Sequence, residues 1–220
     1  KTLNMSMVEQ FFSVKYAGRG ELFQGLSVWE NEKYRKLQGT YPVISLSFAA
    51  VKEKYYESTV QRINQILTDL YYENSFLLES DRLLPEEKED FCQISTGMSE
   101  VTATMALHRL SRYLHKHYSK RVIILLDEYD TPMQEAYVNG YWEELVSFTR
   151  SMFNTAFMTN PYLDRAIMTG ITRVSRESIF SDLNNLKIVT TTSNEYADCF
   201  GFTEEEVFAA LDEYGRSDRK

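Results

Sequence analysis

Residues 122–130, VIILLDEYD, constrain the fold more than any other segment of this sequence. Five consecutive apolar residues without alternation are typical of a strand that is buried on both faces, as in a parallel sheet. This strand is predicted to end in Asp127 and Glu128. Because ligands of open α/β sheets bind beyond the carboxyl ends of the strands, these two acids are the first candidates for a functional site.

Strands and helices are predicted to alternate along the rest of the chain. Helical spacing of apolar residues predicts helices at 3–13, 56–70, 100–114, 142–157 and 204–214, and β-branched or apolar runs predict strands at 41–48, 166–170 and 187–192. A further helix is predicted to start at Pro132. Ser99, Thr131 and the pair Thr203 and Glu206 are expected to cap helices, and the polar residues 15–40 to form a loop. Such alternation predicts an α/β domain with parallel strands and right-handed crossovers.

Composition excludes several classes of protein. The 24 Lys and Arg residues against 32 Asp and Glu give a net charge of −8, which argues against a chain-wide attraction to nucleic-acid phosphates. Cys92 and Cys199 lie far apart and form no CxxC pair, which suits a reducing compartment. No apolar run approaches the roughly 20 residues of a membrane span, and no signal peptide is recognisable. We therefore expect a soluble, cytoplasmic chain without membrane partners.

The acids that follow the central strand have a catalytic interpretation and two competing ones. An apolar strand followed by Asp-Glu is the Walker B pattern, in which Asp127 holds Mg²⁺ and Glu128 polarises a water. An acidic turn that merely ends the strand fits equally well. A haloacid dehalogenase-type phosphatase is less favoured, because Asp127 and Asp130 are three residues apart instead of two. Asp130 is expected to brace the helix that starts at Pro132.

Lys1 and Thr2 open the first predicted helix in the way that the last two residues of GxxxxGK[ST] would. In that interpretation Lys1 reaches the β- and γ-phosphates, Thr2 ligates Mg²⁺, and the helix dipole adds to the attraction. The order of Lys1-Thr2 and Asp127-Glu128 along the chain is the order of the two nucleotide motifs in a P-loop enzyme. The glycines of the phosphate-binding loop are expected upstream.

Five segments, taken in order, resemble the predicted AAA-ATPase-like family of bacterial and archaeal proteins: KTLNMSM, YPVISLSF, VIILLDEYDTPM, TGITRVSRESIFSDLNNL and FGFTEEEV. The resemblance implies a P-loop NTPase core of the AAA+/STAND type, a three-layer αβα sandwich with a mainly parallel sheet. It places this core at 1–200, with the first strand and most of the P-loop missing, and the start of a helical lid at 201–220. Members often continue into a PD-(D/E)xK nuclease-like domain, so a nucleic-acid partner would act through a domain outside these residues.

The resemblance also assigns roles to residues after the central strand. Thr169 ends the following strand, where such ATPases place a sensor of the γ-phosphate, although a hydroxyl that satisfies the local backbone fits equally well. Arg173 and Arg176 lie just beyond, and either could contact phosphate as a sensor or an arginine finger. In this assignment Glu128 and Arg173 are catalytic.

The function implied is binding of ATP and Mg²⁺ and hydrolysis of ATP by the complete protein, coupled to conformational change and to self-association or a protein client. The alternative is a regulatory scaffold that keeps the P-loop fold without hydrolysis. Other polar residues carry no such pattern. His115 and His117 are expected on different faces of a solvated helix, the cysteines among buried apolar residues, and the acidic runs 85–90 and 204–206 in solvent.

Overall fold

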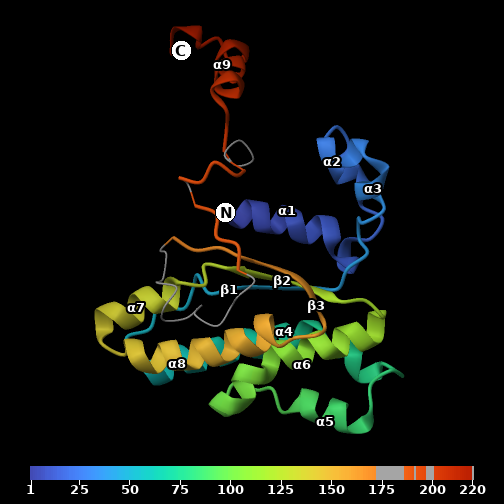
Figure 1. Cartoon of the computed structure of the whole chain (residues 1–220), viewed down its shortest axis with the longest axis vertical. Helices are drawn as coiled ribbons and strands as arrows, with labels where there is room; N and C mark the ends of the chain where they lie inside the picture. Colours follow the sequence, from blue (N-terminus) through green and yellow to red (C-terminus); the bar gives the residue numbers. More distant parts are fainter. Residues whose placement is uncertain (172–185, 191, 197–200, 220) are drawn as a thin grey trace. The chain divides into compact units, whose positions relative to one another are not determined.

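The computed structural model describes residues 1–171, 186–190, 192–196 and 201–219 (Figure 1). The chain forms two compact units, Lys1–Asn184 and Asn185–Lys220, which we describe separately. The first unit contains a parallel sheet in the order β1-β2-β3, formed by Val43–Ser47, Val122–Asp127 and Leu163–Met168. This arrangement confirms the predicted α/β fold with a parallel sheet.

β2 is the central strand of the described sheet, and all six of its residues are buried. Its register brings polar residues together at one edge, because Ser47 of β1 is opposite Asp127 and Met168 of β3 is opposite Leu126. Thr169 follows Met168 directly. The carboxyl ends of three strands therefore meet where the sequence predicts the site.

Helices cover both faces of the sheet and complete the three-layer sandwich (Figure 1). On one face lies α1, Thr2–Phe12, whose Met5 packs with Val43, Ile123 and Leu125. The helices on the other side are α4, α5, α6, α7 and α8, with the bounds Tyr56–Glu73, Pro85–Cys92, Glu100–Tyr118, Thr131–Asn139 and Trp142–Phe153. These bounds confirm the predicted helices to within a few residues.

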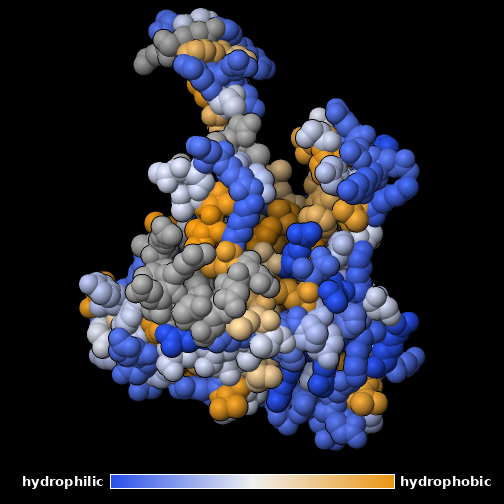
Figure 2. Space-filling model, in the orientation of Figure 1, coloured by the Kyte–Doolittle hydropathy of each residue, from blue (hydrophilic) through white to orange (hydrophobic). Residues whose placement is uncertain are grey.

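The segment 15–40, which we expected to be a loop, contains short helical turns. These are Val14–Tyr16, Gly20–Phe23, α2 at Ser27–Glu30 and α3 at Glu32–Arg35. Turns of three or four residues are too short to produce a helical repeat in the sequence. With α1, the last three of these turns line an apolar hollow of about 1030 Å³, and Figure 2 shows hydrophobic residues gathered over this region.

β3 is not the buried strand that we predicted. The strand begins at Leu163, three residues before the expected segment, and its residues 164–167 are exposed. Within the described residues, β3 pairs with β2 along one edge. Such pairing satisfies backbone groups but does not cover the two faces of the strand, from which the side chains project. Short apolar runs such as AIMTG therefore predict a strand but not its burial.

Two further expectations in this unit need correction. α7 begins at Thr131, so Asp130 instead of Thr131 occupies the N-cap position. In the acidic run 85–90, Glu87 is buried because it bonds to Arg112 and Lys116 of α6 at 2.9 and 2.7 Å. Acidic residues at a helix start are usually solvated, but these two cations offset the cost of burial.

In the second unit, α9 spans Glu204–Glu213 and begins with the predicted capping box. Glu206 N donates to the hydroxyl of Thr203 at 3.2 Å, and Thr203 N donates to the Glu206 carboxylate at 2.7 Å. Residues 187–190 form no strand, which corrects the prediction for the described part of 187–192. A β-branched run needs a neighbouring strand to pair with. Across the described residues of both units, no helix combines the length and apolarity that crossing a membrane requires.

Candidate functional site

The backbone changes direction at the end of β2, and Glu128 is the residue at which it turns. Glu128 has a φ of 52°, in the left-handed region that residues other than glycine seldom adopt. The ladder to β3 is displaced there, because Tyr129 N, one residue later than a regular parallel ladder would place it, donates to Thr169 O at 3.0 Å. Backbone strain of this kind is concentrated at functional sites. The turn separates the two acidic side chains.

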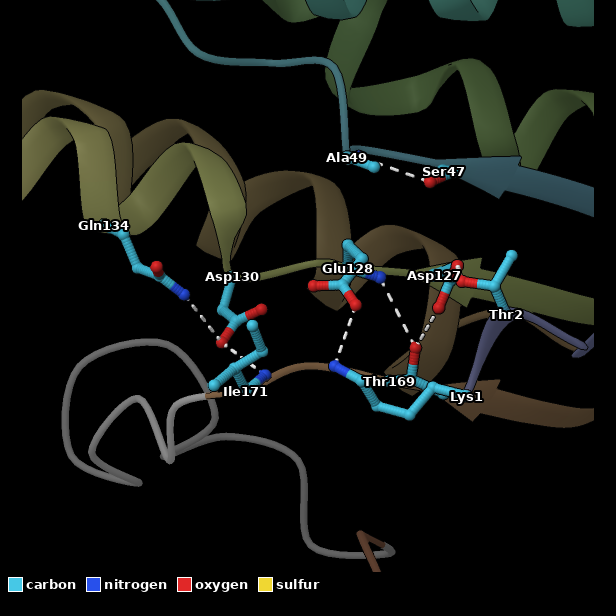
Figure 3. A network of polar contacts seen from close by, with 10 residues as sticks. All are labelled: Lys1, Thr2, Ser47, Ala49, Asp127, Glu128, Asp130, Gln134, Thr169 and Ile171. Atoms are coloured by element: carbon cyan, nitrogen blue, oxygen red, sulfur yellow. Dashed lines mark hydrogen bonds and ion pairs between the residues drawn. The ribbon is translucent and has the colours of Figure 1, made fainter. Parts of the chain in front are cut away.

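Asp127 lies between two hydroxyl groups that come from different elements (Figure 3). Thr2 Oγ1, at the start of α1, donates to Asp127 Oδ2 at 2.6 Å. Thr169 Oγ1, just after β3, donates to Asp127 Oδ1. The side chain is buried, with 6% of the residue exposed. The fold therefore joins the first two residues of the chain to the end of β2, as the P-loop interpretation requires.

Glu128 points away from Asp127 and forms an ion pair with Lys1 (Figure 3). Lys1 Nζ lies 2.8 Å from Glu128 Oε1, and the Lys1 side chain remains 41% exposed. Lys1 also occupies the N-cap position of α1, where its carbonyl accepts a hydrogen bond from Met5 N at 3.0 Å. An exposed ammonium beside a helix N-terminus is a suitable environment for a phosphate group.

Thr169 contacts both acidic residues. Its hydroxyl donates to Asp127 and accepts a hydrogen bond from Glu128 N at 3.4 Å. Its backbone N donates to Leu126 O at 3.0 Å, so the residue also continues the strand ladder. The hydroxyl thus satisfies a backbone group and also reaches the carboxylate.

The oxygen atoms around Asp127 fit Mg²⁺. The Thr2 hydroxyl and the Asp127 carboxylate are adjacent, and such oxygens are the ligands that this hard cation prefers. The described residues contain no group of three or more His, Cys, Asp and Glu side chains with metal-binding geometry. Mg²⁺ sites that work on nucleotides use few protein ligands, because waters and phosphates complete the coordination.

Asp130 was predicted to brace α7, but it also contacts a second segment of the chain. Within the described residues it makes no side-chain capping bond to that helix, although Gln134 Nε2 donates to Asp130 Oδ2 at 3.3 Å. The shorter contact comes from the segment that follows β3, since Ile171 N donates to Asp130 Oδ2 at 2.8 Å. The residue is fully buried. It therefore links the ends of β2 and β3.

Other residues that the sequence brings into question either lie outside the described residues or are placed elsewhere. Arg173, Arg176 and Cys199 lie outside the described residues. Cys92 is a free, exposed thiol instead of a buried one. The histidines of α6 are half-buried instead of solvated, with the ring of His115 close to Tyr162 and His117 Nδ1 bonded to Ser80 Oγ at 2.8 Å.

Two residues at the site escaped the sequence interpretation. Ser47 ends β1 opposite Asp127, and the alignment of parallel strand ends could have indicated it. Gly170 packs so tightly that a β-carbon there would lie 2.7 Å from Asp130 Oδ1 and 2.8 Å from Tyr129 Cε1. No sequence signal announces this contact, because it depends on how two distant segments meet.

A parallel α/β sheet that brings Lys-Thr at a helix start to Asp-Glu at a strand end defines the class of P-loop-type nucleotide-binding domains. Comparison with known proteins agrees. The family described as "Predicted AAA-ATPase" matches residues 1–180, and the chain belongs to this family.

One curated relative is an uncharacterized protein encoded in the 5′ region of vnfD in Azotobacter chroococcum mcd 1. It is 25% identical over 197 residues, which are 89% of this chain and 34% of the relative. The chain thus spans about a third of that protein's length. No solved structure matches the chain significantly.

Proposed function

We propose that this chain is the ATP-binding and ATP-hydrolysing core of an AAA-type ATPase. The observation that carries the proposal is the pairing of two distant motifs, with Thr2 bonded to Asp127 and Lys1 paired with Glu128. These contacts join residues about 125 positions apart into one cluster of hydroxyl, ammonium and carboxylate groups. Membership of the predicted AAA-ATPase family supports nucleotide binding at that cluster.

In this proposal Lys1 contacts the β- and γ-phosphates, and Thr2 and Asp127 hold Mg²⁺. The cation, when bound, neutralises charge on the phosphate oxygens. Glu128 orients a water and takes its proton as the water oxygen bonds to the γ-phosphorus. The bond between that phosphorus and the bridging oxygen breaks, which leaves ADP and inorganic phosphate.

The Lys1–Glu128 ion pair gives this reaction a defined starting state. Glu128 Oε1 forms an ion pair with the Lys1 ammonium, which is the group that the phosphates would bind. Phosphate oxygens compete for the same Lys1 Nζ, and their binding would release Glu128 for its role as base. Two further groups complete the proposal: Thr169 as a sensor beside Asp127, and Arg173, outside the described residues, as a cation for the γ-phosphate.

The proposal extends to the division of the chain. Residues 1–200 form the ATPase core and 201–220 begin a helical lid, so turnover is coupled to movement of the lid or of subunits. A protein client or a second copy of the chain would use that movement.

The test measures Mg²⁺-dependent binding of a fluorescent ATP analogue, and steady-state hydrolysis, in the full-length protein. Asp127→Asn should weaken binding at least about tenfold because a Mg²⁺ ligand is lost, and Glu128→Gln should keep binding but lower turnover about 10²–10⁴-fold. Lys1→Ala should abolish nucleotide affinity. Asp164→Asn, at the amino end of β3, is the matched control and should change neither quantity.

Different failures would remove different parts of the proposal. Unchanged hydrolysis in Glu128→Gln excludes Glu128 as the base. Normal affinity in Lys1→Ala excludes the assignment of Lys1 to the phosphates. A folded protein that binds no nucleotide would be a non-hydrolysing scaffold.

A further inference from the structure

Beyond the ends of β2 and β3, a hydrogen bond to a side chain replaces the backbone hydrogen bonds that join the two strands. Two backbone bonds still join the segments, from Thr169 N to Leu126 O and from Tyr129 N to Thr169 O, each 3.0 Å long. The next contact is different, because Ile171 N donates to the carboxylate of Asp130 at 2.8 Å. The two segments therefore stay attached for two residues past Thr169.

The backbone that follows β2 turns away from β3 at this point. Immediately after the left-handed residue Glu128, the chain turns into α7. The Glu128 carbonyl accepts from Thr131 N at 3.2 Å, and the Asp130 carbonyl accepts from Gln134 N at 3.0 Å. Both carbonyls are therefore committed to the start of the helix. The Asp130 carboxylate, in contrast, accepts from Ile171 N in the segment that follows β3.

Packing around this contact leaves little room for adjustment. Asp130 is fully buried, and the backbone of Gly170 packs directly against its carboxylate. A β-carbon on Gly170 would come within 2.7 Å of Asp130 Oδ1, which is closer than any tolerable contact. Only glycine lets the backbone between Thr169 and Ile171 lie directly against the carboxylate.

We propose that Asp130 is a positioning residue for the ATPase reaction, because it fixes the backbone 169–171 and thereby holds the Thr169 hydroxyl against Asp127 and Glu128. The inference rests on the proposed function and adds a residue that touches neither nucleotide nor metal. Thr169 Oγ1 contacts Asp127 and accepts from Glu128 N, so a shift of its backbone moves both acids. Misplacement of catalytic groups by about 1 Å can cost about 10²-fold in rate.

A role confined to bracing α7 predicts something different. In that case the contact that matters is the one from Gln134 Nε2 to Asp130 Oδ2, which is 3.3 Å long. Gln134→Ala removes that contact and leaves Ile171 N bonded to the carboxylate. The two roles can therefore be separated by one variant.

The experiment uses the full-length protein and measures turnover, ATP affinity and hydrogen exchange of the Ile171 amide. Asp130→Ala should lower kcat about 10–100-fold and weaken ATP binding less than Asp127→Asn does, because the positioning of the acids is disturbed while every ligand group is kept. The Ile171 amide should exchange at least about tenfold faster, since its acceptor is gone. Asp130→Asn should restore both, because its amide oxygen accepts the same hydrogen bond.

Two controls sharpen the result. Gln134→Ala should leave kcat and Ile171 exchange near their wild-type values. Glu87→Gln, which alters another buried acid far from the site in α5, should lower stability without changing kcat. If Asp130→Ala does not fold, Gly170→Ala disturbs the same contact from the other side and should lower kcat with ATP affinity retained.

Three outcomes overturn the inference: an unchanged kcat in Asp130→Ala and Gly170→Ala, an equal loss in Gln134→Ala, or unchanged exchange of Ile171 in Asp130→Ala. If the wild-type protein binds but does not hydrolyse ATP, the proposed function fails by itself. The exchange measurement then still decides whether Asp130 fixes the backbone 169–171.

Discussion

At the scale of single residues, Thr169 shows how one hydroxyl can organise two acids with opposite orientations. It donates to Asp127 and accepts from Glu128 N, while its own backbone is held by β2. A hydroxyl has one proton to donate and lone pairs to accept with, so both contacts can exist at once. The separation of Asp127 and Glu128 therefore depends on a residue from a different strand.

We expect Thr169→Val to lower turnover about tenfold or more and to destabilise the protein by about 1–3 kcal/mol, because the buried Asp127 carboxylate and the partly buried Glu128 N each lose a partner. Valine has nearly the same shape as threonine, so packing changes little. Thr169→Ser, which keeps the hydroxyl, is the control and should retain most of the activity. Steady-state hydrolysis and urea unfolding measure the two effects. A valine variant as active as wild type would contradict the role of the hydroxyl.

At the scale of elements, α5 is attached to α6 through a buried carboxylate. Burial by itself would raise the pKa of Glu87, but the bonds from Lys116 and Leu84 N and the charge of Arg112 hold that pKa below its ordinary value. The lowered pKa means that the folded protein favours the ionised form. Stability from this group is therefore present above the pKa of the unfolded chain and is lost as pH falls through the lower, folded value.

Glu87→Gln should consequently destabilise the protein by roughly 2 kcal/mol at pH 7, because two charge-assisted hydrogen bonds are weakened. On going from pH 7 to below about pH 4.3, where an unperturbed glutamate becomes protonated, the free energy of unfolding should fall less in the variant than in the wild type. Urea unfolding at pH 7 and pH 3.5, followed by circular dichroism, measures the difference. Glu86→Gln, an exposed neighbour on α5, should behave as wild type. Parallel pH curves for the Glu87 variant and the wild type would contradict the prediction.

At the scale of the whole molecule, ligand binding should be visible as stability. The site joins α1, β2 and β3, which unfolding separates, so only the folded protein can bind Mg-ATP there. A ligand at 100 times its dissociation constant stabilises the folded state by about 2.7 kcal/mol. We expect Mg-ATP to raise the melting temperature of the full-length protein by several degrees.

The matched experiment repeats the melting curve with Asp127→Asn and with Mg²⁺ or ATP alone. The shift should disappear in the variant and be small with either component alone, because the site needs both. An equal shift in Asp127→Asn would place the nucleotide elsewhere on the molecule.

Much of the fold was predictable because local patterns coincide with tertiary demands. The unbroken apolar run of β2, the spacing along α4 and α6 and the cap at Ser99 each predict an element that the structure contains. The short turns within 15–40 and the exposed faces of β3 were missed. The turns are too short to produce a helical repeat in the sequence. The burial of β3 depends on which neighbour covers its faces, and the pattern within the strand does not report that.

The sequence by itself determined the class of the sheet, the order of its elements and the acidic end of β2, since these follow from hydrophobic patterning and strand geometry. Only the tertiary structure decided that Thr2 and Thr169 both reach Asp127, that Lys1 pairs with Glu128, and that Asp130 faces β3. The physical reason is distance along the chain. Hydrogen bonds between residues 41 to 125 positions apart depend on register and packing, which no local pattern encodes.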